Sequence, residues 1–279
     1  MENEALVRLV FFLGIFIIVA IWEIRSPRRT LNTSKTVRWV SNLGIIVVNT
    51  FLVRAVFPVM AINIAFTAQE NGWGLFNNLA VPGWFAVIGC VVLLDMIIYL
   101  QHVMFHAVPV LWRLHMMHHA DLDYDVTTGL RFHPIEMVLS MIIKMGSVAA
   151  LGAPVLAVLI FEILLNALAM FNHGNIRLPA HIDRVLRLFV VTPDMHRVHH
   201  SVTIRETNSN FGFNIPWWDR LMGTYRDQPA AGHEGMTIGL SQFRDAGRLT
   251  LPWMLVLPFI GDPGQYSINK TGKEPVKRN

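Results

Sequence analysis

The residues best suited to chemistry in this sequence are its twelve histidines, most of which fall into three short motifs. The motifs are HxxxH and then HxxHH twice, formed by His102 and His106, by His115, His118 and His119, and by His196, His199 and His200. Spacings of three and four residues place side chains on one face of a helix. Because imidazole nitrogens bind iron, zinc, copper and nickel, the motifs predict a metal centre.

The clustered imidazoles are too numerous for one metal ion. Tetrahedral zinc takes four ligands and octahedral iron takes six, so eight clustered histidines predict two ions. Nearby carboxylates are expected to orient the rings through hydrogen bonds. One candidate is Asp95, which lies seven residues before His102 on the same face of an apolar helix. The other candidates flank the motifs and are Asp121, Asp123, Asp125, Asp194 and Asp219.

Apolar helices must position these motifs. The chain is 53% hydrophobic and 15% charged, with a mean hydropathy of +0.44, which excludes an ordinary soluble domain. The segment 6–22 is expected to be a retained helix, and segments 39–60 and 82–106 are each long enough to cross about 30 Å of hydrocarbon. The run 135–170 is interrupted by Gly152, Ala153 and Pro154 and predicts a helical hairpin. Within it, Lys144 and Glu162 are expected to face the bundle or to snorkel.

Loop charges give the expected orientation of these helices. Basic residues between 25 and 38 are expected to stay in the cytoplasm, whereas 61–81 contains no Lys or Arg and is expected to be a loop on the opposite side. All histidine motifs then lie on the cytoplasmic side. The predicted fold is an all-α integral membrane protein, with about three transmembrane spans plus a helical hairpin and a histidine-rich helical cytoplasmic cap. A bacterial inner membrane is favoured.

We expect one membrane-embedded unit over 1–279. It comprises N-terminal transmembrane helices at 1–82, a catalytic region at 83–226, and an interfacial segment with a tail at 227–279. The apolar run 249–260 is too short to span a membrane and is expected to lie at its interface. The net charge of +4 is explained by basic residues that flank apolar segments, so nucleic acid is excluded as a partner. The single cysteine, Cys90, is expected to be a buried core residue.

The order of the motifs resembles the fatty acid hydroxylase and sterol desaturase superfamily. The resemblance covers 95–226 and includes His173 in the sequence FNHGN. It also includes LWRLH at 111–115, RFHPIE at 131–136, NFG at 210–212 and WDRLMGTY at 218–225. It implies a membrane-bound, non-haem di-iron oxygenase that uses O2 to hydroxylate a fatty acyl chain or related lipid. Two iron ions are the implied cofactor, and zinc can replace them in purified protein.

The resemblance also implies roles for particular residues. The implied metal ligands are His102, His106, His115, His118, His119, His173, His196, His199 and His200. Asp95, His133 and Asp219 are expected to act in catalysis, and His133 could instead be a ligand, a donor behind the ligands or a substrate-pocket residue. Some family members have a further histidine four residues after His173, where this chain has Arg177, so a tenth ligand stays open.

Several alternatives stay open. Sterol desaturase or sterol oxidase activity and ether-lipid monooxygenase activity share the same histidine pattern. A metal transporter is an alternative of another class, although its ligands should lie near the middle of the bilayer. The sequence has no HExxH motif for a zinc hydrolase, and no GxGxxG or CxxC series for a bound electron carrier. A separate electron donor is therefore expected, either a ferredoxin or a cytochrome-b-type protein with its reductase.

Overall fold

The computed structural model describes residues 4–271, in which the regular elements are helices joined by turns and irregular segments, with two isolated β-bridges. The long helices are α1 Glu4–Arg25, α2 Lys35–Val56, α4 Gly83–Ala107, α6 Pro134–Leu151 and α7 Val155–Asn172. The remaining elements are α3 Ala61–Glu70, α5 Pro109–His119, η1 Thr128–Leu130, α8 Ala180–Leu186, α9 Pro193–His199, α10 Ile204–Thr207, α11 Trp217–Leu221, α12 Gly232–Gly235, η2 Ala246–Leu249, α13 Leu251–Ile260 and α14 Ile268–Thr271.

Five helical segments among the described residues are long and apolar enough to cross a membrane: α1, α2 continued by α3, α4, α6 and α7. The hairpin predicted at 135–170 is confirmed as α6 and α7. Gly152 ends α6 with a φ of 61°, a left-handed conformation that glycine adopts without strain, and Pro154 precedes the first turn of α7. The protein is therefore an all-α, multi-pass membrane protein.

The connection at 61–81 differs from the expected loop. Its first half forms α3, which packs against α6 and α7. The preceding helix ends at Val56, just before Pro58, whose ring cannot continue a helix. Ala61, Ile62 and Ala65 of α3 join the buried core of the bundle. Packing of these small apolar side chains explains why the segment is helical despite its short length.

A charged cluster inside the bundle confirms that Lys144 and Glu162 face its interior. Lys144 Nζ donates a hydrogen bond to Glu162 Oε1 at 2.8 Å, joining α6 to α7. Arg8 of α1 pairs with the other oxygen of the same carboxylate. The three charged groups thus satisfy one another away from water, as intramembrane charges must.

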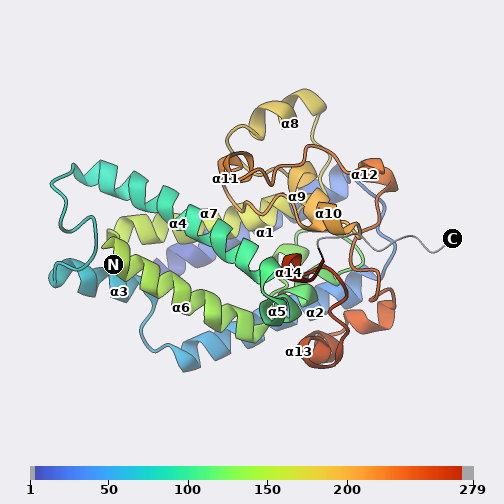
Figure 1. The fold of residues 1–279 in the computed structure, drawn as a ribbon, viewed down its shortest axis with the longest axis horizontal. Helices are drawn as coiled ribbons and strands as arrows, with labels where there is room; N and C mark the ends of the chain where they lie inside the picture. The colour runs from blue at the N-terminus through green and yellow to red at the C-terminus, as the bar shows by residue number, and fades with distance from the viewer. Residues whose placement is uncertain (1–3, 272–279) are drawn as a thin grey trace.

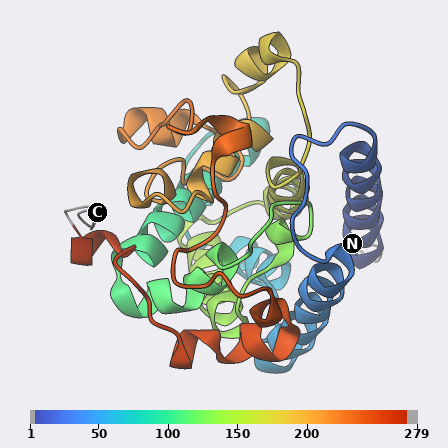
Figure 2. The same cartoon turned by 90° about the vertical axis from the view of Figure 1, so that its right-hand side faces the viewer.

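The short helices from α8 to α12 form a cap at one end of the bundle. In Figure 1 the long helices run along the horizontal axis, and α9, α10 and α12 gather at the right-hand end. Figure 2 faces that end and shows α1, in dark blue, at the edge of the bundle. The apolar helix α13 packs against α2 and α5 at the side of the cap. The ends of α4 and α7 therefore meet the cap helices, which brings distant histidine motifs together.

Candidate metal centre

Four segments bring their histidines to the junction of bundle and cap. His102 and His106 occupy the last turns of α4, and α5 begins directly afterwards with Pro109 at its first position, where proline is favoured. The other predicted ligands are His115, His118 and His119 on α5, His173 at the end of α7, and His196, His199 and His200 on or at the end of α9. All are buried. The structure thus assembles every histidine for which the resemblance implies metal binding.

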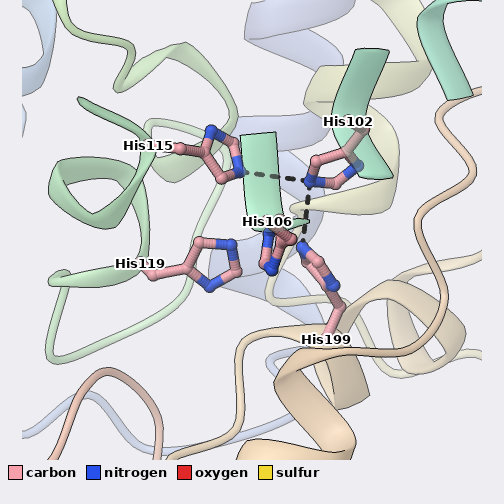
Figure 3. A group of neighbouring side chains, drawn as sticks. All are labelled: His102, His106, His115, His119 and His199. Atoms are coloured by element: carbon pink, nitrogen blue, oxygen red, sulfur yellow. Dashed lines mark hydrogen bonds between the residues drawn. The ribbon is translucent and has the colours of Figure 1, made fainter. Parts of the chain in front are cut away.

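The histidines divide into two groups whose ligand nitrogens lie within 4.8 Å of one another. One, the five-histidine group, contains His102, His106, His115, His119 and His199. The other, the four-histidine group, contains His118, His173, His196 and His200. Figure 3 shows the rings of the five-histidine group pointing toward a common centre from α4, α5 and α9. Two groups match the expectation of two metal ions.

Carbonyl oxygens behind the rings fix which nitrogen faces inward. Nδ1 of His102 bonds to the Phe211 carbonyl at 2.7 Å, and Nδ1 of His199 bonds to the Ser209 carbonyl at 2.7 Å. In the other group, Nδ1 of His173 bonds to the Ala169 carbonyl at 2.8 Å. A carbonyl can only accept, so each Nδ1 carries the hydrogen and each neutral ring turns the lone pair of Nε2 inward.

The inward nitrogens lie within hydrogen-bond distance of one another. Nε2 of His102 lies 3.1 Å from Nε2 of His115 and 3.1 Å from Nε2 of His199, as the dashed lines in Figure 3 mark. Nε2 of His173 lies 3.2 Å from Nε2 of His118. Where both nitrogens carry lone pairs, neither can donate to the other. Converging lone pairs are the arrangement that a bound cation requires, so the residues fit a metal centre.

Other ring nitrogens at the centre have no hydrogen-bond partner. They include Nε2 of His106 and His119 and both ring nitrogens of His196 and His200. A buried polar atom without a partner is rare and costs about 1–3 kcal/mol. Coordination to a metal would satisfy one nitrogen of each ring.

Burial and mutual repulsion keep the rings neutral. Desolvation lowers the pKa of His118, His119, His196, His199 and His200 well below the usual value, and neighbouring histidines lower it further. Desolvation lowers the pKa of His173 to about 3. Neutral imidazole is the form that binds metal, so the site is prepared for cations near neutral pH.

Comparison with known proteins identifies the part of the chain that holds these groups. The family model described as fatty acid hydroxylase matches residues 87–224, about half of the chain, and the match contains both histidine groups. Residues 87–224 belong to the fatty acid hydroxylase family. This confirms the resemblance found in the sequence.

Relatives of the fatty acid hydroxylase domain act on several lipids according to their names. An ornithine lipid hydroxylase of Rhizobium tropici is 30% identical over 148 residues, which are 53% of this chain and 44% of that protein. Human alkylglycerol monooxygenase is 26% identical over 52% of this chain and 32% of its own length. Human cholesterol 25-hydroxylase is 26% identical over 50% of this chain and 51% of its own length. The chain thus spans about half or less of these relatives. No solved structure matches it significantly.

Two side chains that sequence reasoning missed orient rings of the hydroxylase domain. The Glu136 carboxylate accepts a hydrogen bond from Nδ1 of His115 at 2.7 Å. The Asn208 side-chain oxygen lies 3.1 Å from Nδ1 of His106. Glu136 stands in the RFHPIE segment, in the first turn of α6 after Pro134, but it is twenty-one residues from its histidine in sequence. Only the packing of α5 against α6 shows this pairing.

Asp219 and Asp95 support the domain indirectly. The Asp219 carboxylate accepts hydrogen bonds from the backbone nitrogens of Phe211, at 2.8 Å, and Gly212, at 2.9 Å. It therefore holds the peptide segment whose Phe211 carbonyl orients His102. Asp95 accepts a hydrogen bond from Nε1 of Trp218 at 2.8 Å, which ties α11 to α4. Their expected catalytic roles stay predictions, and no bond from either carboxylate to a histidine is found in the described chain.

The other candidate aspartates also bind groups other than the metal-site rings. Asp121 and Asp125 form buried ion pairs with Arg38 of α2, and Asp123 accepts hydrogen bonds from the backbone of Asn32 and Thr33. Asp194 pairs with Arg28 and Arg197, and lies 3.6 Å from Nε2 of His233. The expectation that these four aspartates orient ligand rings is replaced by a scaffolding role. Their charges anchor α2 and the segment between α1 and α2 to α9 and to the segment that follows α5.

His133 lies outside both histidine groups. It precedes α6, where Nδ1 accepts a hydrogen bond from the Ile135 backbone nitrogen at 3.3 Å. Nε2 lies 3.2 Å from the Leu255 carbonyl of α13. These contacts give His133 a helix-capping role that joins α6 to α13. A substrate-facing role for His133 stays a prediction.

Proposed function

We propose that this protein is a membrane-bound oxygenase that hydroxylates a lipid, with a fatty acyl chain as the first candidate. The nine histidines of the two groups would hold two iron ions. When bound, iron supplies the O2 chemistry that no amino-acid side chain provides. The protein supplies ligand geometry, a dry site and a place for the apolar substrate.

The observation that carries this proposal is the convergence of neutral imidazoles in two groups. These groups lie within residues 87–224, which match the fatty acid hydroxylase family. Hydrogen bonds to carbonyl groups orient several rings before any metal binds. The ring of Phe132 stacks on His118 with centroids 4.7 Å apart and an angle of 10° between planes. Phe211 and Phe213 pack edge-on or tilted against His102. These aromatic side chains exclude water from the histidines.

The position of the site at the ends of α4 and α7 supports a lipid substrate. An alkyl chain could reach the junction of bundle and cap while its apolar part stays between apolar helices. The same position disfavours a metal transporter, whose ligands should lie near the middle of the bilayer. We further propose that the cap faces the cytoplasm of a bacterial inner membrane, because basic residues such as Arg25, Arg28 and Arg29 flank the spans on that side.

Metal content and product mass test this proposal together. Protein expressed in iron-supplemented cells should carry about two iron ions per chain, the number that two histidine groups predict. With a lipid extract, O2 and a reductant, products should gain one oxygen atom. His118→Ala should abolish that gain while a surface control, Arg248→Ala, retains it. Iron-loaded protein with no O2-dependent product, or metal uptake into vesicles without O2 use, would contradict the proposal.

A second candidate, ether-lipid cleavage, is favoured by the matches to alkylglycerol monooxygenases. One of these, from Danio rerio, aligns with 66% of this chain at 28% identity. Hydroxylation of the carbon beside an ether oxygen gives a hemiacetal, which breaks down to an aldehyde and an alcohol. Incubation with an alkylglycerol distinguishes the reactions, since release of a fatty aldehyde indicates ether cleavage and a stable hydroxylated chain indicates acyl hydroxylation.

We propose that a separate electron donor docks at a cleft on the cap. A cleft of about 370 Å³ is lined by Arg28, Arg29 and Arg177, with Glu234 as an acidic member. Behind it, the Arg197 guanidinium lies 5.2 Å from the ring of Tyr124. That ring stacks on His173 with centroids 5.4 Å apart. A small acidic redox protein in this basic cleft would approach the four-histidine group.

Charge reversal at the cleft tests this docking place. Arg177→Glu should slow reduction by an acidic ferredoxin and weaken its dependence on salt, because one attractive charge is replaced by a repulsive one. Arg248→Glu provides the same charge change outside the cleft. Equal rates for the two variants would exclude this cleft as the docking place.

A further inference from the structure

The exposed apolar side chains of the cap are concentrated on one side. Between α7 and α13, every exposed large hydrophobic residue lies on α8, in the turn after it, on α11 or directly after α11. These residues are Ile182, Val185, Leu188, Phe189, Trp217, Leu221 and Met222, and together they form the α8–α11 patch. Leu221 is 72% exposed and Phe189 is 61% exposed. Such concentration of apolar surface indicates an interaction site, because isolated exposed residues would be scattered.

The position of α11 along α4 identifies what this patch meets. Nε1 of Trp218 donates to Asp95 at 2.8 Å, and the hydroxyl of Tyr99 lies 2.9 Å from that of Thr224. These bonds hold α11 and the segment after it beside residues 95–99 of α4. About 20 helical residues are needed to cross a hydrocarbon layer of about 30 Å. Counted from Gly83, the first residue of α4, such a span extends beyond Tyr99. A span that begins at Gly83 would place the exposed side of α11 at a depth where α4 itself contacts lipid.

Helix α8 is fixed to α11 and extends the same surface. Nε1 of Trp217 donates to the Leu188 carbonyl at 2.7 Å, and Arg220 donates to the Arg187 carbonyl at 3.3 Å. Figures 1 and 2 both show α8 projecting from the side of the cap, opposite α13. Because α13 is itself apolar and exposes Phe259, the cap has apolar helices on two opposite sides.

The polar residues around the patch suit a membrane surface. Arg184 and Arg220 are exposed beside it, whereas Asp183 is buried and paired with Arg187. Tryptophan is enriched at membrane interfaces, and Trp217 is 45% exposed within the patch. A short helix with one apolar side and basic neighbours typically lies in the boundary between headgroups and acyl chains. The basic residues would attract anionic headgroups.

We infer that α8 and α11 lie in the interface of the same bilayer that the long helices cross, with the α8–α11 patch in contact with lipid. This contact is independent of the proposed reaction, since it concerns how the cap rests on the membrane. Together with α13, it seats the cap on the bilayer from two sides. The histidine groups are thereby held close to the level where lipid chains begin.

Site-specific labels test the contact in the full-length protein. Val185→Cys and Leu221→Cys, made in a Cys90→Ala background, would carry an environment-sensitive fluorophore in vesicles of phosphatidylcholine and phosphatidylglycerol. The control is Gln228→Cys, an exposed cap position outside the patch. Labels at the two patch positions should emit at shorter wavelength than the control, and should be quenched by lipid-attached nitroxides and protected from iodide. All three native side chains are exposed, so each variant should retain the parent melting temperature.

Two results would overturn the inference. Iodide quenching of the Leu221→Cys and Val185→Cys labels equal to that of the Gln228→Cys control would place the patch in water. Self-quenching between labels on different chains, relieved by dilution with unlabelled protein, would show that a second copy covers the patch instead of lipid. Neither result depends on iron loading or on hydroxylase activity, so this test is separate from that of the proposed function.

Discussion

Glu136 accepts a hydrogen bond from Nδ1 of His115 at 2.7 Å, which joins the first turn of α6 to the middle of α5. Both side chains are buried. The carboxylate fixes the ring so that Nε2 faces the five-histidine group, and it adds a negative charge next to ligands that are otherwise neutral. Glu136 is therefore a positioning residue for the proposed metal.

Replacement of Glu136 should weaken metal binding more than it weakens folding. Glu136→Ala should lower iron affinity by about 10–100-fold, the usual effect of removing a carboxylate behind a metal-bound histidine. Glu136→Gln should lower iron affinity less than Glu136→Ala does, because the glutamine amide oxygen can still accept the hydrogen bond. Iron retained per chain during titration with a chelator measures the effect. Glu234→Ala is the matched surface control, and iron retention by Glu136→Ala equal to that control would refute the positioning role.

Arg38 should contribute strongly to stability. Its guanidinium is completely buried and bonds to both oxygens of Asp121, at 2.7 and 2.9 Å, and to Asp125 at 2.6 Å. Arg38→Ala would leave two buried carboxylates without their cation, at a cost of about 3–5 kcal/mol. Arg38→Lys should recover part of the loss but not the two-bond contact with Asp121. Denaturation midpoints in detergent rank the stabilities of the parent, Arg38→Lys and Arg38→Ala. An Arg38→Ala variant as stable as the parent would contradict the prediction.

The histidine motifs were predictable from the sequence because helical spacing alone places their side chains together. Apolar runs likewise predicted α4 and the α6–α7 hairpin. The helix α3 was not predicted, since its stability comes from packing of Ala61 and Ala65 in the core and not from any signal in a short loop. Local sequence also could not show that Glu136 meets His115, because that pairing depends on how α5 and α6 pack.

The aspartates show a second limit of sequence reasoning. Their proximity to the motifs suggested contact with the rings, yet Asp121 and Asp125 turn to Arg38. A buried guanidinium pairs more strongly with a carboxylate than a neutral imidazole does. Partners of this kind are distant in sequence, so only the folded chain reveals them.

Acid should destabilise the protein partly through His233. Desolvation lowers the pKa of this buried ring to about 4 despite Asp194 nearby, compared with an ordinary value of 6.5. As the pH falls, the unfolded chain therefore binds this proton before the folded protein does. The contribution of the neutral, buried His233 ring to stability is complete above about pH 6.5 and is lost as the pH falls toward 4. His233→Gln should flatten the dependence of melting temperature on pH in that window. Identical slopes for variant and parent would show that His233 does not contribute.

The charged cluster in the bundle should be required for stable packing of α1. Glu162 pairs with Lys144 of α6 and Arg8 of α1, so Glu162→Leu leaves two cations without their shared carboxylate. The expected loss in unfolding free energy is up to about 3 kcal/mol. Replacing a charged pair with apolar residues is often neutral, so the double variant Lys144→Leu/Glu162→Leu should recover much of that loss. Melting temperatures in lipid nanodiscs compare the two, and a double variant no more stable than Glu162→Leu alone would show that the unpaired charge of Lys144 is not the cause.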